Sequence, residues 1–150
     1  GREITAYVPR FSPQIAVNGM EDGEQLTFPL MNCQAKRLRS FAEKAPFGKG
    51  LDTVLDESVR KAWQIDADKV KFCDSKRWQT ALKRVVLDCA ASLGMTVAQQ
   101  TNVQANLYKL LLYETGGHFK KHRDTEKEPG MFGTLIIQLP SRFTGGALVI

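Results

Sequence analysis

The fold of this chain is decided by the stretch from Tyr113 to Asp124, which reads YETGGHFKKHRD. At its end, His122 and Asp124 are separated by one residue. In an extended strand, two such side chains point to the same face, ~6.6 Å apart along the chain. A neutral imidazole and a carboxylate are both ligands that ferrous iron accepts. The stretch therefore predicts a short strand whose two side chains lean toward one metal ion.

The segments on either side of this stretch predict strands and turns. The apolar run Leu107–Tyr113 reads as a buried strand, sandwiched because both of its faces are largely apolar. Gly116-Gly117 predicts a turn, Pro129-Gly130 closes a polar loop, and Thr134–Leu139 predicts a second strand. A histidine and an aspartate among charged residues are also typical of a solvated loop, so the HxD tripeptide alone is a weak signal. The strands around it favour a metal site.

The spaced pattern YxxGxxFxxHxD is carried here by Tyr113, Gly116, Phe119, His122 and Asp124. It resembles the iron-binding core of the prolyl 4-hydroxylase-like branch of the 2-oxoglutarate- and Fe(II)-dependent oxygenases. The resemblance in motifs lies in the C-terminal part of the chain. Other segments are similar to that family, the last four of them less specifically: Thr134–Leu139, Gly145-Gly146, Phe47–Gly50, Val59, Arg60 and Trp63.

The resemblance implies an α+β fold, namely a double-stranded β-helix (jelly roll) supported by N-terminal helices. Residues 1–150 would form one incomplete domain. Residues 1–102 would be the supporting helices and strands, and residues 103–150 the first strands of the jelly roll, with the HxD motif among them. The fold is thus expected to be truncated within the jelly roll.

The resemblance also implies the site residues and the chemistry. His122 and Asp124 would be the metal ligands and the catalytic residues. Tyr113, Thr134 and Gln138 would bind the cosubstrate, although the family often has tyrosine at the position of Gln138. The implied cofactors are Fe(II), 2-oxoglutarate as cosubstrate, and ascorbate as a further candidate. The implied reaction is hydroxylation of an unknown substrate, a peptide or a small molecule, with release of succinate and carbon dioxide.

The number of histidines limits this interpretation. The iron arrangement needs two histidines and one carboxylate, and the chain has only His118 and His122. Along an unbroken strand these two would lie ~13 Å apart, whereas both ligating nitrogens must come within ~2.1 Å of one metal. We therefore expect the distal histidine to come from beyond Ile150 or from another chain.

Two residues upstream of the motif are candidates for walls of the active site, Arg60 and Trp63. An arginine can hold a carboxylate of a substrate or cosubstrate through two parallel hydrogen bonds. The alternative is that Arg60 is a surface ion-pair residue.

Two helices are predicted before residue 103. Asn32 is a good N-cap for a helix over Cys33–Ala45, whose apolar residues recur at helical spacing. Ser75 is expected to cap a longer helix, which carries an apolar stripe and stops at Gly94. The remaining predictions are strands at Ile4–Val8 and Leu26–Phe28, a helix-to-strand turn at Phe47–Gly50 and a polar loop at Thr96–Asn102.

Composition bounds the functional class. With 150 residues, 43% hydrophobic and 25% charged, the chain is typical of one soluble domain. No apolar run approaches the ~18 residues of a membrane span. The three cysteines show no CxxC spacing, which favours a reduced intracellular setting, most simply the cytoplasm.

The net charge of +5 favours an anionic partner, but the basic residues are scattered over predicted helix faces. Two alternatives to an oxygenase therefore stay open. One is a non-catalytic jelly-roll interaction module, since a fold does not fix a function. The other is a basic nucleic-acid-binding domain, whose affinity should fall steeply with salt.

Overall fold

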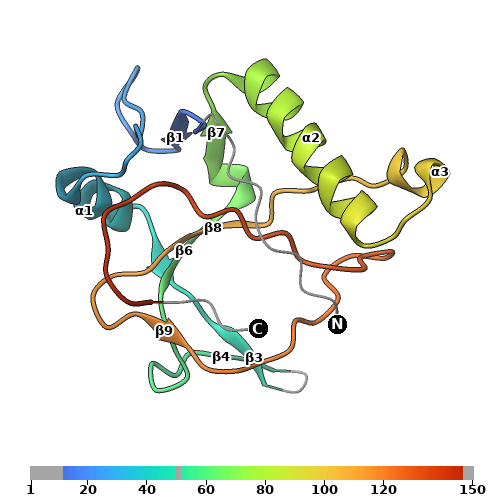
Figure 1. The fold of residues 1–150 in the computed structure, drawn as a ribbon. Coiled ribbons are helices and arrows are strands. Elements are labelled where there is room, and N and C mark those ends of the chain that lie inside the picture. The colour runs from blue at the N-terminus through green and yellow to red at the C-terminus, as the bar shows by residue number, and fades with distance from the viewer. Residues whose placement is uncertain (1–11, 50–51, 147–150) are drawn as a thin grey trace.

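Helices and short antiparallel strands make up the computed structural model, which describes residues 12–49 and 52–146. The α+β class is therefore confirmed at this coarse level. The elements in chain order are β1 (Ile15–Val17), α1 (Asn32–Ser40), β2 (Glu43–Lys44), β3 (Phe47–Lys49), β4 (Asp52–Val54), β5 (Arg60–Lys61), β6 (Trp63–Asp66), the 3₁₀ helix η1 (Ala67–Lys69), β7 (Val70–Phe72), α2 (Ser75–Ser92), α3 (Val97–Gln100), β8 (Lys109–Leu112) and β9 (His118–Phe119). In Figure 1, α1 and α2 lie on either side of β1 and β7, and β3, β4 and β9 lie toward the opposite end.

The strands form one three-stranded sheet, in the order β2-β6-β8, and three two-stranded pairs. The register of the larger sheet sets Ile65 of β6 opposite Leu110 of β8, and Trp63 opposite Leu112. The pairs are β1-β7, β3-β4 and β5-β9, all antiparallel. In the described part of the chain these sheets do not close into a barrel or a jelly roll. The division of the chain at residue 102 stays a prediction.

The hydrophobic core lies between the β1-β7 pair, α1 and the larger sheet. Apolar residues from these elements pack into one cluster because each strand turns one face inward. Its buried members are Ile15, Val17, Leu26, Leu38 and Ile65, and partly buried residues packed against them include Phe41, Val70, Phe72, Leu110, Leu112 and Leu139. Burial of such side chains contributes roughly 1.5–3 kcal/mol each.

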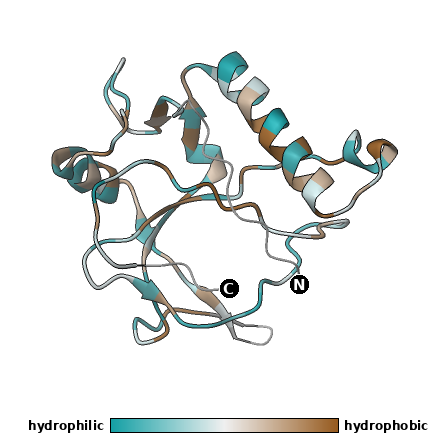
Figure 2. Ribbon diagram, viewed as in Figure 1, coloured by the Kyte–Doolittle hydropathy of each residue, from teal (hydrophilic) through white to brown (hydrophobic). Residues whose placement is uncertain are grey.

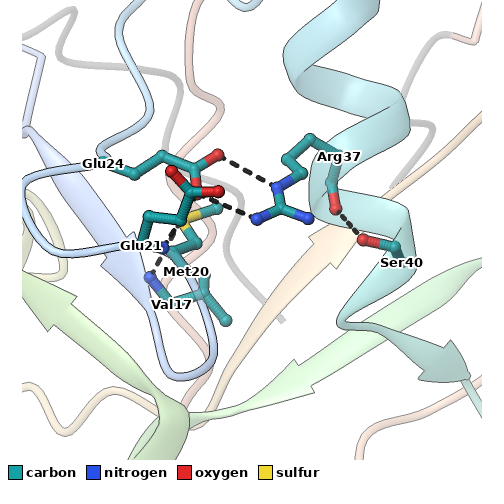
Figure 3. Close-up of polar contacts among 6 residues, drawn as sticks. All are labelled: Val17, Met20, Glu21, Glu24, Arg37 and Ser40. Carbon is teal, nitrogen blue, oxygen red and sulfur yellow. Dashed lines mark hydrogen bonds and ion pairs between the residues drawn. The ribbon is translucent and has the colours of Figure 1, made fainter.

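The turn after β1 is joined to α1 by an ion pair (Figure 3). Glu24 accepts two hydrogen bonds from the guanidinium of Arg37, both at 3.1 Å. The same guanidinium lies 4.7 Å from the centre of the Phe41 ring. Ser40 donates to the carbonyl oxygen of Arg37 at 2.6 Å, in the last turn of the helix. These contacts fix the turn after β1 to α1.

Helix α2 is the longest helix and was predicted in nearly its full extent. Trp78, Val85, Val86 and Ala90 are buried, and polar and apolar residues alternate along the ribbon (Figure 2). Trp78 stacks on Phe72 of β7 with ring centres 5.1 Å apart, so this helix is held against the β1-β7 pair. Among the described residues, no helix is both long and apolar enough to span a membrane.

The caps of α2 differ in part from the prediction. The N-cap is Asp74 and not Ser75, because the Asp74 carboxylate accepts the hydrogen bond from the Arg77 amide. At the other end Gly94 has φ +80°, the left-handed conformation that stops a helix. The predicted stop is therefore confirmed.

The predicted helix over Cys33–Ala45 was too long. The structure ends α1 at Ser40 and places Glu43–Lys44 in β2, and Asn32 is the first helical residue and not the cap. The i, i+3, i+4, i+7 spacing continued past Ser40 by coincidence. Ala45 is buried, but outside any helix: its amide donates to the Ala62 carbonyl oxygen at 2.9 Å.

Several short segments also differ from prediction. Leu26–Phe28 is no strand: Leu26 alone bridges to Ile15. Phe47–Lys49 is strand β3 and not a turn, and the predicted polar loop at Thr96–Asn102 contains helix α3, capped by the Thr96 hydroxyl. The predicted strand Ile4–Val8 lies outside the described residues.

The two strands expected beside the HxD motif are only partly present. β8 is there, but Leu111, and Tyr113 just after the strand, are exposed on the face opposite Leu110 and Leu112, so the strand packs on the core with one face only and is not sandwiched. Thr134–Leu139 forms no strand; Leu139 reaches the core, and the Leu30 amide donates to the carbonyl oxygen of Pro140 at 2.8 Å. The alternating apolar residues of this segment therefore make isolated contacts, and its backbone forms no ladder of hydrogen bonds with another strand.

Candidate metal centre

A tight turn delivers the HxD motif to its place. The amide of Gly117 donates to the carbonyl oxygen of Glu114 at 2.7 Å, and Gly116 has φ +72°, a conformation that favours glycine. After this turn, β9 pairs with β5, and the amide of Lys120 donates to the carbonyl oxygen of Val59 at 2.9 Å. The chain leading into the motif is thereby anchored on β5.

His122 and Asp124 follow β9 but lie in no strand. The predicted strand geometry for the pair was therefore wrong. Their side chains nevertheless approach one another: His122 Nε2 and Asp124 Oδ1 are 3.6 Å apart. The convergence comes from contacts that each side chain makes with other residues.

The His122 ring is oriented by two contacts. Its Nδ1 lies 2.8 Å from the carbonyl oxygen of Lys120, and the ring stacks on Phe119 with centres 3.5 Å apart and planes at 20°. A carbonyl can only accept a hydrogen bond, so Nδ1 carries the proton in the neutral ring. This assignment leaves the Nε2 lone pair directed toward Asp124, as a metal ligand requires.

The Asp124 carboxylate is oriented by one hydroxyl. Thr134 donates from Oγ1 to Oδ2 at 2.7 Å, which leaves Oδ1 facing His122. Thr134 had been assigned to the cosubstrate by resemblance, and its observed partner is the carboxylate. The threonine lies ten residues beyond Asp124, a contact that sequence spacing does not indicate.

The separation of the two ligand atoms is longer than a direct hydrogen bond, and longer than the separation of adjacent ligands on one octahedral ion. A nitrogen and oxygen in a hydrogen bond lie about 2.7–3.2 Å apart, and the 3.6 Å seen here is longer. Two adjacent ligands at ~2.1 Å from an octahedral ion lie roughly 3 Å apart, and opposite ligands roughly 4.2 Å. At 3.6 Å, the two atoms would have to approach by about 0.6 Å to ligate one octahedral ion as neighbours.

Among the described residues, a third protein ligand is not found. In residues 12–49 and 52–146, no three side chains of histidine, cysteine, aspartate or glutamate gather as a metal site. His118 lies on β9 opposite Lys61, with Nδ1 3.2 Å from the carbonyl oxygen of Gly116 and Nε2 3.3 Å from that of Ser58. Both of its ring nitrogens lie near backbone oxygens, and that it does not serve as the second histidine stays a prediction.

The other two predicted cosubstrate residues are not tied to the pair. Tyr113 and Gln138 are both exposed. Among the described residues neither side chain has a hydrogen-bonding partner, so the structure leaves both as predictions.

Both wall candidates border a cleft of about 510 Å³ beside the turn. Arg60 donates from Nη1 to the carbonyl oxygen of Pro46 at 2.7 Å. Trp63 donates from Nε1 to Glu114 at 2.8 Å, and Arg39 lies 4.6 Å from the Trp63 ring centre while it pairs with the same carboxylate. Among the described residues, Arg60 contacts a backbone carbonyl and the Phe119 ring and forms no ion pair, unlike the surface ion-pair alternative. Glu114 and Arg39 were not singled out from sequence, since nothing in their spacing from Trp63 indicates this contact.

The chain was compared with protein-family models, with curated proteins and with solved structures, and none of them matches. The resemblance therefore rests on the motif residues themselves.

Proposed function

We propose that this chain carries part of the active site of a non-haem Fe(II)- and 2-oxoglutarate-dependent oxygenase. His122 and Asp124 supply two of its three protein ligands. The observation that carries the proposal is the approach of His122 Nε2 to Asp124 Oδ1 at 3.6 Å, with the opposite atom of each group held by another partner. The remaining ligand would come from beyond Ile150 or from another chain.

The residues of this chain would act by binding and orienting. When bound, the iron would supply the oxidative chemistry with dioxygen as the oxidant: one oxygen atom would enter succinate as 2-oxoglutarate loses carbon dioxide, and the other would enter the hydroxylated substrate. The Lys120 carbonyl keeps the proton of His122 on Nδ1, and Thr134 keeps Oδ1 of Asp124 turned toward His122. Such partners around ligands typically change metal affinity by about 10- to 100-fold.

The finer fold belongs to the same proposal. The sheet of β2, β6 and β8 and the β5-β9 pair would be the first part of a double-stranded β-helix. Support comes from the apolar side chains left exposed on β8 and after the motif, which further strands would cover: Leu111, Tyr113, Leu135, Ile136 and Phe143. Tyr113 and Gln138 would then face 2-oxoglutarate inside the completed barrel.

A second function competes for one specific reason. The side chains of His122 and Asp124 are 41% and 54% exposed. An exposed histidine and aspartate can form an ordinary surface pair that contributes little. A non-catalytic interaction module with such a pair would bind neither iron nor 2-oxoglutarate.

The test is formation of succinate from 2-oxoglutarate by the intact protein, with Fe(II) and with a chelator. We expect iron-dependent succinate from the unaltered protein and a fall to the chelator level in His122→Ala and Asp124→Ala. His118→Ala is the matched control and should retain turnover, because that ring bonds backbone oxygens. Absence of iron-dependent succinate, or turnover that survives in His122→Ala, would refute the oxygenase.

A separate measurement addresses the nucleic-acid alternative. Binding of a labelled DNA duplex is followed at rising salt, because phosphate contacts make affinity fall steeply with ionic strength. We expect no tight binding at physiological salt, because Arg37 and Lys44 are engaged with acidic side chains and Arg39 with Glu114. Tight, salt-sensitive binding together with absent succinate would favour the basic-domain function.

A further inference from the structure

Three side chains form a stack that ends at the candidate metal ligand His122. The β5-β9 register places Arg60 directly opposite Phe119. The Arg60 guanidinium carbon lies 4.5 Å from the centre of the Phe119 ring. The His122 imidazole lies 3.5 Å from the same ring centre, nearly parallel to it. Phe119 thus connects Arg60 to His122.

The two partners of Phe119 must occupy opposite faces of its ring. A parallel imidazole at 3.5 Å fills one face, so a guanidinium over the ring has only the other face available. Attraction of a cation to an aromatic face holds that side in place. Arg60 thereby fixes the plane of the Phe119 ring, and the Phe119 ring fixes the plane of the imidazole stacked on it.

Arg60 is itself anchored. Its Nη1 donates to the carbonyl oxygen of Pro46 at 2.7 Å, which ties the guanidinium to the chain between β2 and β3. Its Nε, in contrast, is buried and has no hydrogen-bonding partner among the residues that the structure describes. A buried donor left unpaired costs free energy, so this placement of Arg60 is poorly explained by stability alone.

We infer that Arg60 is a positioning residue for His122. Acting through Phe119, it holds the imidazole in the plane that keeps Nδ1 on the Lys120 carbonyl and Nε2 toward Asp124. Arg60 also borders the cleft of Trp63 and Glu114, so the same side chain belongs to the cleft wall and to the support of the metal ligand. The consequence for metal affinity rests on the proposed function; the orientation of the ring does not.

The variants are Arg60→Met, which keeps an apolar stem and removes the guanidinium, and Arg60→Lys, which keeps a cation. The matched control is Arg37→Met, because Arg37 lies over Phe41 at 4.7 Å in the same manner but far along the chain from the motif. The first readout is the pair of ¹⁵N ring shifts of His122 in the intact metal-free protein, assigned by their loss in His122→Ala. The second is affinity for Mn(II), used as a redox-stable probe.

In the unaltered protein and in Arg37→Met we expect the shifts of a ring protonated on Nδ1. Arg60→Met should show a mixture of the two tautomers and about a tenfold lower Mn(II) affinity, the lower end of the usual effect of such partners. Arg60→Lys should lie between these two. If Arg60→Met fails to fold, the His122 ring shifts of Arg60→Lys decide whether Arg60 positions the imidazole.

Unchanged ring shifts in both Arg60 variants would overturn the inference. So would equal losses in Arg37→Met, since they would show a general effect of removing a stacked arginine. If the unaltered protein binds no Mn(II), the metal proposal fails, and the ring shifts alone still decide the role of Arg60. The two failures are therefore distinguishable.

Discussion

Gly117 has no room for a side chain. A Cβ at this position would lie 2.8 Å from the Glu114 carbonyl oxygen and 3.1 Å from that of Lys61, both backbone atoms that cannot turn aside. We expect Gly117→Ala to lower the free energy of unfolding by about 1–3 kcal/mol, the usual cost of forcing extra atoms into a packed place. Urea unfolding followed by circular dichroism measures the change.

The matched control for this substitution is Gly133→Ala. A Cβ there meets nothing within 4 Å, and its φ is not in the left-handed region. We expect its free energy of unfolding to stay within about 0.5 kcal/mol of that of the unaltered protein. Equal effects at both glycines would show that the turn tolerates displacement.

Thr134 is the residue whose contact most affects the geometry of Asp124. Thr134→Val removes the hydroxyl that donates to Oδ2 at 2.7 Å and keeps the shape of the side chain. If the metal proposal is correct, we expect Mn(II) affinity to fall about 10- to 100-fold, because the carboxylate can then rotate away from His122. Thr125→Val, which removes a hydroxyl bonded to Lys127 instead, should leave the affinity unchanged. A Thr134→Val affinity equal to that of the unaltered protein contradicts this role.

At the level of residues, sequence spacing predicted that the side chains of His122 and Asp124 approach one another, for a reason that proved wrong. His122 and Asp124 converge, yet no strand places them. The contacts that do so involve a carbonyl two residues back, a ring three residues back and a hydroxyl ten residues ahead. Only the ring belongs to the sequence motif. Backbone carbonyls are present everywhere in a chain, so a sequence cannot say which of them a histidine will meet.

Helices and strands were predictable where an apolar pattern repeated over many residues. α2 has eighteen residues, and its apolar residues recur on one face over about four turns before a glycine stop. A repeat of that length predicts a packed helix. α1 has nine residues, and its apolar spacing ran on past β2 to Ala45, whose amide donates to the Ala62 carbonyl oxygen. Pairings of two or three residues, such as β5 with β9, leave no periodic signal because the ladder is too short to repeat.

The first turn of α2 offers a prediction at this scale. Asp74 caps the helix through its carboxylate, which accepts from the Arg77 amide at 3.3 Å. We expect Asp74→Ala to lower stability by about 1 kcal/mol, since one of the unpaired amides of the first turn loses its acceptor. Thermal unfolding should register a fall of about 2–4 °C for a chain of this size.

Asp88→Ala serves as the control in the same helix. Asp88 is exposed in the helix interior, where alanine is the better helix former. Its midpoint should stay the same or rise. A fall as large as that of Asp74→Ala would assign the effect to lost charge and not to capping.

For the molecule as a whole, stability depends on the single core that joins β1, α1, β6 and β8. Ile65 is 2% exposed, and it faces Leu110 across the sheet. Ile65→Ala should cost about 2–5 kcal/mol through lost burial and the cavity left behind. In residues 1–150 alone, Leu111→Thr, on the open face of the neighbouring strand, should change stability by only about 0.5 kcal/mol. In a longer protein, a large loss at Leu111 would mean that another part covers this face, as the proposed jelly roll requires.

The response of the whole molecule to acid follows from two carboxylates on its surface. Hydrogen bonds from the Arg37 side chain, and secondarily from the Glu21 amide, lower the pKa of Glu24, and Lys44 lowers the pKa of Glu57 in the same way. A carboxyl group whose pKa is lower in the folded than in the unfolded chain stabilises the fold above its unfolded value, ~4.3, and this contribution is lost as pH falls through the folded value.

The unfolding free energy should therefore fall as the pH drops below ~4, and the fall should be small because both pairs are exposed and screened by salt. A ¹³C titration of the Glu24 carboxyl should give a value below the ordinary one, and Arg37→Met should return it toward that value. Urea unfolding at several pH values should show a shallower acid dependence in Glu24→Gln than in the unaltered protein. A Glu24 carboxyl that titrates at its ordinary value would show that the bonds to Arg37 do not persist in solution, and the turn after β1 would then not be fixed to α1 in the way the structure has it.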